Sequence, residues 1–237
     1  MKLKLEQLKH ALESYTFKND LVSNNLANIN TTGYKRDVMF MDLLDEIDTN
    51  HDNKNVITEF NQGTLKDTGN PLDVAISGRG FFTVEQNGNE YFTRDGHFTV
   101  NNDGTLINSE GFKVLGQGGE INVSLDGTKT GDFSISKLGE IFINDEYIDT
   151  LKLVDFSDYK NLKKEGVNLF SIKNNIEPFE PEIFTVSQRN LEESNVNSVN
   201  EMVEMISLHR NFESTQRAVK TLDDALGKAA NDIGRYR

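Results

Sequence analysis

Hydrophobic side chains near both ends of the chain recur at alternating spacings of three and four residues, a pattern typical of a helix with a coiled-coil seam. The N-terminal series runs from Leu5 to Ile29, and Asn19 is its one polar member. The C-terminal series runs from Met205 to Ile233. We therefore predict a long helix at each end. Neither has a helical neighbour in the sequence, so we expect the two helices to pair with each other and with those of other subunits.

The start of the second helix carries two further signals. Ser198 and Glu201 have the spacing of a capping box, in which each residue satisfies a free backbone N–H group of the other. Additional apolar residues widen the hydrophobic face at this end of the helix. These residues are Val199, Met202, Val203 and Ile206.

The middle of the chain has a different pattern. Fourteen of the 18 glycines fall between Gly63 and Gly139, and short alternating apolar segments lie between turn residues. The segment 86–89, Gln-Asn-Gly-Asn, predicts a hairpin. Closely spaced strands without intervening helices indicate an antiparallel sandwich or barrel. The predicted fold is α+β, with a helical core formed by 1–37 and 191–237, a connection at 38–70 and a central β-domain at 71–190.

Charge and composition exclude several classes of function. The net charge is −13, and the negative excess lies in the middle because the two terminal segments nearly balance. Nucleic-acid binding needs a basic surface, so we predict none. The chain has no cysteine, which excludes disulfides and thiolate metal sites. No apolar run approaches the roughly 20 residues that span a membrane, and the first residues lack the apolar core of a secretory signal.

Candidate catalytic and ligand-binding residues are few. The four histidines are scattered, and Gly78-Arg79-Gly80 lacks the third glycine of a dinucleotide loop. The segment from Asp48 to Glu59 has the oxygen-ligand spacing of a calcium loop, but no convincing helix follows it, which favours a solvated acidic linker. We predict no enzyme activity, no cofactor and no resident metal.

Three segments, which follow one another in the same order as in the family, resemble the flagellar rod and hook proteins. The first, residues 23–35, reads Ser-Asn-Asn-Leu-Ala-Asn-Ile-Asn-Thr-Thr-Gly-Tyr-Lys, and the second comprises 73–82 and 91–96. The third comprises 194–197 and 201–206. The resemblance implies a structural subunit of the bacterial flagellar basal-body rod. It also implies partners among other rod and axial proteins, possibly copies of itself, and export through the flagellar type III apparatus without a cleaved signal peptide.

Within the family, residues 209–216 and 228–235 resemble the FlgF type more than the FlgG type, and the segment between Lys35 and Gly63 is short. The chain departs from the family pattern at its start, Met-Lys-Leu-Lys-Leu, where members carry small and aromatic residues. The alternatives are a FlgG-type distal rod protein or a hook-like axial protein. A more remote alternative is a β-domain binding module with oligomerising helices.

The predicted assembly interface combines apolar seam residues with polar residues of the family signatures. Buried amides can fix the register of paired helices, which is the role that we assign to the asparagines. The predicted interface residues are Leu8, Leu12, Tyr15, Val22, Asn24, Asn25, Leu26, Asn28, Ile29, Asn30, Gly33, Asn195, Val199, Met202, Met205, Ile206, Phe212, Val219, Leu222 and Leu226.

Overall fold

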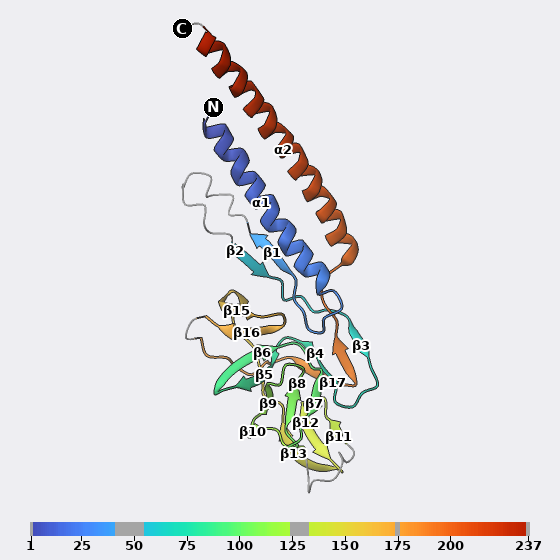
Figure 1. Cartoon of the computed structure of the whole chain (residues 1–237). Coiled ribbons are helices and arrows are strands. Elements are labelled where there is room, and N and C mark those ends of the chain that lie inside the picture. The colour runs from blue at the N-terminus through green and yellow to red at the C-terminus, as the bar shows by residue number, and fades with distance from the viewer. Residues whose placement is uncertain (1, 41–54, 124–132, 174–175, 236–237) are drawn as a thin grey trace. The chain divides into compact units, whose positions relative to one another are not determined.

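A computed structural model describes residues 2–40, 55–123, 133–173 and 176–235. The chain forms two compact units (Figure 1). The helical unit contains residues up to 27, the segment from 37 to 57, and residues from 197 onward. The β unit contains residues 28–36 and 58–196. The fold is α+β, as the sequence predicts.

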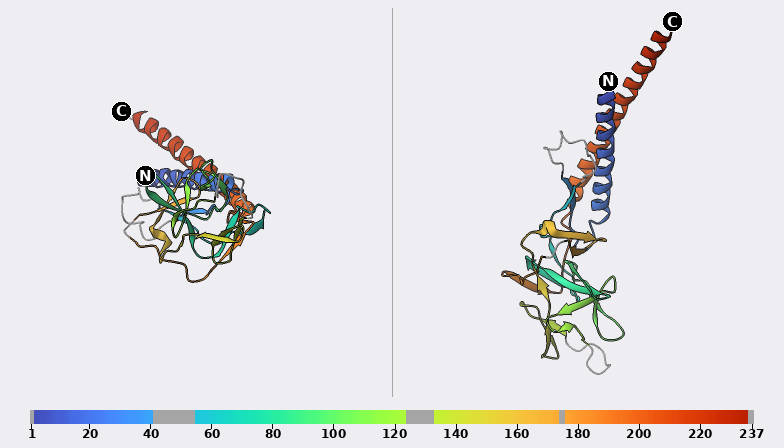
Figure 2. Two further views of the ribbon diagram at one scale, coloured as in Figure 1. Left: turned by 90° about the horizontal axis from the view of Figure 1, so that it is seen from below. Right: turned by 90° about the vertical axis from the view of Figure 1, so that its left-hand side faces the viewer.

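The helical unit is built on two long helices, α1 (Lys2–Ala27) and α2 (Ser198–Arg235). They contact each other and run in opposite directions, as both views in Figure 2 also show. Two short strands, β1 (Asp37–Phe40) and β2 (Asn55–Thr58), pair with each other, and β1 also contacts α1. The cap of α2 differs from the predicted capping box. Asn197 precedes the helix, and its side-chain oxygen accepts a hydrogen bond from Asn200 N at 3.1 Å.

The β unit is a set of antiparallel sheets. Its largest sheet has the strand order β15-β16-β6-β5-β9-β8-β7, with β10 on β9 and β14 on β5. A three-stranded sheet has the order β11-β12-β13, and two further pairs are β17-β4 and β18-β3. The bounds are β3 (Leu65–Asp67), β4 (Val74–Gly78), β5 (Phe81–Gln86), β6 (Asn89–Thr93), β7 (Phe98–Val100), β8 (Leu106–Asn108), β9 (Lys113–Gly116), β10 (Gly119–Glu120), β11 (Phe133–Ile135), β12 (Glu140–Ile143), β13 (Glu146–Thr150), β14 (Leu153–Val154), β15 (Leu162–Glu165), β16 (Leu169–Ile172), β17 (Phe184–Gln188) and β18 (Asn190–Glu192), with a 3-10 turn at Tyr159–Asn161.

The predicted hairpin is present in this unit. Strands β5 and β6 pair from Gln86 and Asn89 back to Phe82 and Thr93. The two turn residues, Asn87 and Gly88, have φ of 54° and 82°, as a type I′ turn requires. Aliphatic and aromatic side chains fill two buried clusters, one around Phe82, Phe98 and Val114 and the other around Phe81, Phe92 and Phe170.

The segment 28–36, which the sequence assigns to the end of the N-terminal helix, packs within the β unit. Gly33 has a φ of +66°, and its N–H donates to Glu192 O at 2.8 Å. A Cβ atom at this position would collide with the backbone of Arg94 and Asp95. The position therefore needs glycine both for its backbone conformation and for the close approach of the neighbouring chain.

A buried ion cluster holds the same segment. The Lys35 ammonium lies 2.5 Å from one oxygen of Glu192, and the Arg94 guanidinium lies 3.2 Å from the other. The side chains of Lys35 and Glu192 are almost fully buried, at 1% and 0% exposure. Lys35 also donates to Asn61 O at 2.8 Å, and Glu192 accepts from Gly63 N at 2.9 Å. Burial lowers the pKa of Lys35, and the charge of Glu192 opposes that shift.

Replacing Gly33 with alanine should destabilise the protein by about 2 kcal/mol or more, because the left-handed conformation and the backbone collision both oppose a Cβ atom. Gly69→Ala is the matched control, since Gly69 has a similar φ of +71° and a Cβ atom there would meet nothing within 4 Å. Urea unfolding of both variants measures the difference. Equal losses would contradict the role given to the close approach.

Replacing Lys35 with methionine should cost about 3 kcal/mol, because Glu192 then keeps a buried charge with one cation fewer. Lys113→Met is the control, because Lys113 forms a 2.6 Å pair with Glu120 in which both side chains are exposed. Exposed pairs contribute little, so this variant should unfold as the parent does. A K35M protein as stable as K113M would show that the buried cluster does not hold the segment.

Candidate assembly surfaces

Asn25 is the most buried of the signature asparagines in the helical unit. It is 1% exposed, and its side chain bonds to both backbone groups of Asp37, to the N–H at 3.0 Å and to the C=O at 2.8 Å. Its amide also lies 3.4 Å from Glu201, which is fully buried near the start of α2. Asn25 therefore joins α1, β1 and α2 inside one subunit. Its predicted contact with other subunits stays a prediction.

Most of the other signature asparagines of the predicted interface belong to the β unit, whereas Asn24 lies in α1. Asn195 accepts a hydrogen bond from Arg36 N at 2.7 Å and donates to Glu59 O at 2.7 Å. Asn28 accepts from the Thr31 hydroxyl at 3.1 Å, which closes the turn after α1. Asn24 and Asn30 are exposed, and Ile29 is half-buried. The signature thus supplies contacts within the chain, a use that the residue pattern alone does not reveal.

A second feature of the signature lies beside Gly33. Thr32 donates to one oxygen of Asp95 at 2.7 Å, and Asn168 donates to the other at 3.0 Å. Asp95 is 3% exposed, and burial raises the pKa of its carboxyl while these hydrogen bonds oppose the shift. The carboxyl thus fixes the turn of the signature onto the β unit.

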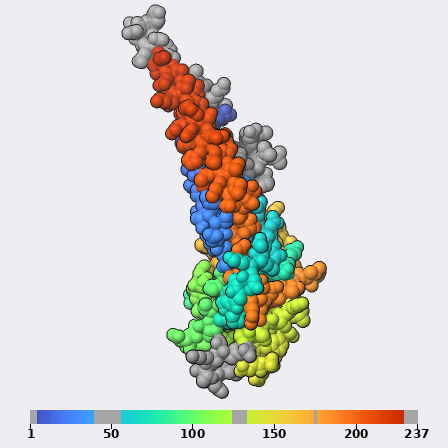
Figure 3. Space-filling model, turned by 90° about the vertical axis from the view of Figure 1, so that its right-hand side faces the viewer, coloured from blue at the N-terminus to red at the C-terminus, as the bar shows by residue number. Residues whose placement is uncertain are grey.

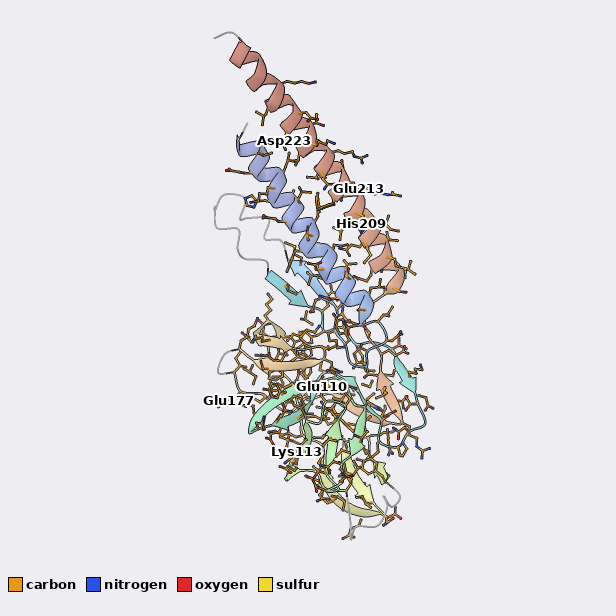
Figure 4. The ribbon with its side chains drawn as sticks, in the orientation of Figure 1. Glu110, Lys113, Glu177, His209, Glu213 and Asp223 are labelled. Atoms are coloured by element: carbon orange, nitrogen blue, oxygen red, sulfur yellow. The ribbon has the colours of Figure 1, made fainter. Side chains whose placement is uncertain are left out.

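Most predicted seam positions of both helices are shielded from solvent. On α1 the seam positions from Leu5 to Leu26 are partly or fully buried, and on α2 those from Met205 to Leu222 are as well. Leu226 is 38% exposed. The Asn25–Glu201 contact sets the alignment of the two antiparallel helices, and Figure 4 shows Asp223 level with the start of α1 in agreement.

Asn19 interrupts the apolar seam of α1. Its side-chain oxygen is buried and has no hydrogen-bond partner among the described residues. Extending the alignment of Asn25 with Glu201 along two antiparallel helices brings Asn19 level with Ser207, whose side chain is exposed on the helix surface. The pairing of α1 with α2 therefore leaves one buried polar atom unsatisfied.

Four large apolar side chains lie exposed on α2: Val199 at 65%, Met202 at 50%, Val203 at 61% and Ile206 at 54%. Their spacing places them on one stripe of the helix, about opposite the seam at 100° per residue. Figure 3 views α2 from the side away from α1. Val203 is missing from the predicted interface residues, although the widened apolar pattern contains it.

No catalytic or metal-binding constellation appears in the described part of the chain. It contains no group of three or more potential metal ligands. His97 pairs with Asp73 at 2.7 Å, and His10 lies 3.5 Å from Glu13, while His51 and most of the calcium-like segment fall outside the described residues. An open pocket of about 370 Å³ is lined by residues of β6, β15 and β16. None of the described helices is long and apolar enough to cross a membrane.

Three parts of the chain match known protein families. Residues 18–35 match "Flagella basal body rod protein", residues 75–143 match "Flagellar hook protein FlgE/F/G D1 domain", and residues 187–232 match "Flagellar basal body rod FlgEFG protein C-terminal". These ranges contain the three segments on which the sequence resemblance rests.

Relatives that match along most of the chain indicate the same family. The chain is 32% identical over 226 residues to the flagellar basal-body rod protein FlgF of Caulobacter vibrioides, with 91% of each chain covered. It is 31% identical over 240 residues to FlgG of Agrobacterium fabrum, covering 86% of this chain and 89% of the relative. It is 28% identical over 253 residues to FlgG of Bacillus subtilis, covering 93% and 95%. The chain therefore belongs to the flagellar basal-body rod protein family.

Proposed function

We propose that this protein is a FlgF-type structural subunit of the flagellar rod, which assembles with other rod proteins through its terminal helices. The observation that carries the proposal is the exposed apolar stripe on α2 in a member of the rod family. Monomeric proteins rarely expose a contiguous stripe of this kind without a partner. A structural role, and not catalysis, is what the matches to rod proteins indicate.

The two helices supply the contacts that a rod needs. A heterologous contact repeated along a screw axis builds a filament that does not close. The apolar seams would pack as a coiled coil in an inner tube, and the β unit would form an outer layer. Burial of apolar surface would drive assembly at about 25 cal/mol per Å². The signature asparagines would fix the register.

The FlgF type is favoured over the FlgG type by the segments 209–216 and 228–235 and by the short connection after Lys35. Relatives of both types have similar identity to this chain, so a FlgG-type distal rod protein is the second candidate. Partners would be neighbouring rod and axial proteins and copies of this chain. Export would use the flagellar type III machinery, and the assembled subunit would lie in the basal body.

Replacing Leu208 with aspartate should abolish swimming while the protein is still made. Leu208 is 7% exposed on the seam, and an unpaired carboxylate there should destabilise helix packing by about 3 kcal/mol. Ser207→Asp, on an exposed position of the same helix, is the control and should swim normally. Normal motility of the L208D cells would show that the seam is not needed for assembly.

Cells without this protein should stop with a truncated rod and no hook, as seen by electron microscopy of purified basal bodies. A short connection between helix and β unit suits a subunit present in few copies at a junction. Extra FlgG-type protein should not restore the rod. Labelled copies of this chain along most of the distal rod would favour the FlgG type instead.

A further inference from the structure

The outer face of α2 changes character along the helix. Its first two turns carry the exposed apolar stripe, and the same face continues with Arg210, Arg217 and Lys220, all exposed. Within it, Val203, Arg210 and Arg217 follow one another every seven residues. Residues at that spacing form one column along a helix. The structure gives neither arginine an ion pair among the residues that it describes.

Helix α1 carries a matching column of opposite charge. Glu6, Glu13, Asp20 and Ala27 also follow one another every seven residues, and all four are exposed. Glu13 lies 3.8 Å from Lys9 and 3.5 Å from His10, and all three side chains are exposed, so these interactions contribute little and leave the carboxylate available. The α1 column is thus acidic along most of its length and ends in a small apolar residue.

The two columns fit each other in an antiparallel alignment that pairs their apolar members as well as their charges. When Ala27 is set beside Val203, Asp20 falls beside Arg210 and Glu13 beside Arg217. One apolar pair and two ion pairs therefore form over three consecutive heptads. Glu6 then meets Asp224, but Lys220 and Lys228 lie one turn away on either side of that aspartate.

One chain cannot bring these two columns together. Both point away from the seam along which α1 and α2 already contact each other, as the angular spacing of 100° per residue requires. The α2 column of one copy can meet the α1 column only of another molecule. Two α2 columns facing each other would bring arginines together, and two α1 columns would bring carboxylates together. Repulsion of like charges therefore excludes a contact between two identical columns.

Resting on the proposed rod function, we propose that the outer face of α2 binds the acidic column of α1 from a second copy of this chain. The contact is heterologous, so a pair of copies keeps one free column of each kind and can bind a further copy at either end. The apolar stripe of α2 lies beside the last turn of α1 in this contact. A shift of one heptad in one direction sets Glu13 against Asp224 and leaves a single ion pair. A shift in the other direction keeps two ion pairs but sets Asp20 against Val203 and carries Ala27 beyond Ser198, the first residue of α2. The apolar pair and the ion pairs together therefore set the register.

Engineered cysteines test this register, since the natural chain has none. Chains carrying D20C alone and chains carrying R210C alone are mixed in cells that lack the parent protein, and their basal bodies are oxidised. A disulfide-linked dimer of mixed composition is expected. Pairing D20C with R217C is the matched control, because one heptad moves the partners about 10.5 Å apart, beyond the roughly 7 Å Cα separation that a disulfide tolerates.

Three results would overturn the proposal: no mixed dimer, equal dimer from the control pair, or R210C dimers, which would indicate a closed two-fold contact. A D20C or R210C chain linked to a different rod protein would also overturn it. The rod function itself would stand in each case if the cells still swim.

Charge reversal supplies a second measurement. R210E should reduce the number of copies retained in purified basal bodies, and D20R in the same chain should restore it, because every contact between copies again joins opposite charges. Circular dichroism of the soluble proteins should be unchanged, since both residues are exposed. Full retention of the R210E chain, or no recovery in the double variant, would contradict the contact.

Discussion

The buried pair of Lys35 with Glu192 is the interaction on which the rest of the structure depends. Lys35 follows the end of α1 by eight residues, and Glu192 precedes the start of α2 by six. The pair joins chain segments that are 157 residues apart. Holding these segments together removes most of the loop-closure entropy cost that would otherwise oppose the pairing of α1 with α2. A buried charge pair can perform this task because removing either partner leaves the other charge unsolvated.

The fold could be predicted from the sequence where the signals are local. The three-and-four spacing locates both helices, and Asn87-Gly88 locates the β5–β6 hairpin, because periodicity and turn chemistry act over a few residues. The position of residues 28–36 could not be predicted in this way. The helical pattern continues to Ile29, but the contacts of Gly33 and Lys35 with Glu192 and of Thr32 with Asp95 end the helix at Ala27. The cap at Asn197 was missed because Ser198 offers the same chemistry one residue later.

The candidate site was predictable to a different degree in its two parts. Apolar positions near the start of α2 were recognisable from their spacing, and the structure leaves Val199, Met202 and Ile206 exposed. The signature asparagines were harder to interpret, because an amide that bonds within its own chain and one that bonds to a neighbour have the same sequence pattern. Asn25 and Asn195 have partners within the chain. Their residue type indicates hydrogen bonding, but only three-dimensional structure identifies the partner.

The unsatisfied oxygen of Asn19 has a consequence for how a subunit behaves before it meets others. A buried acceptor without a donor costs about 1–3 kcal/mol relative to one that is bonded. This cost lowers the stability of the helix pair and does not affect the buried clusters of the β unit. We therefore expect the helix pair of the free subunit to be less stable than its apolar seam alone would make it. A helix pair weakened in this way can adjust its packing more easily when a neighbouring subunit contacts it.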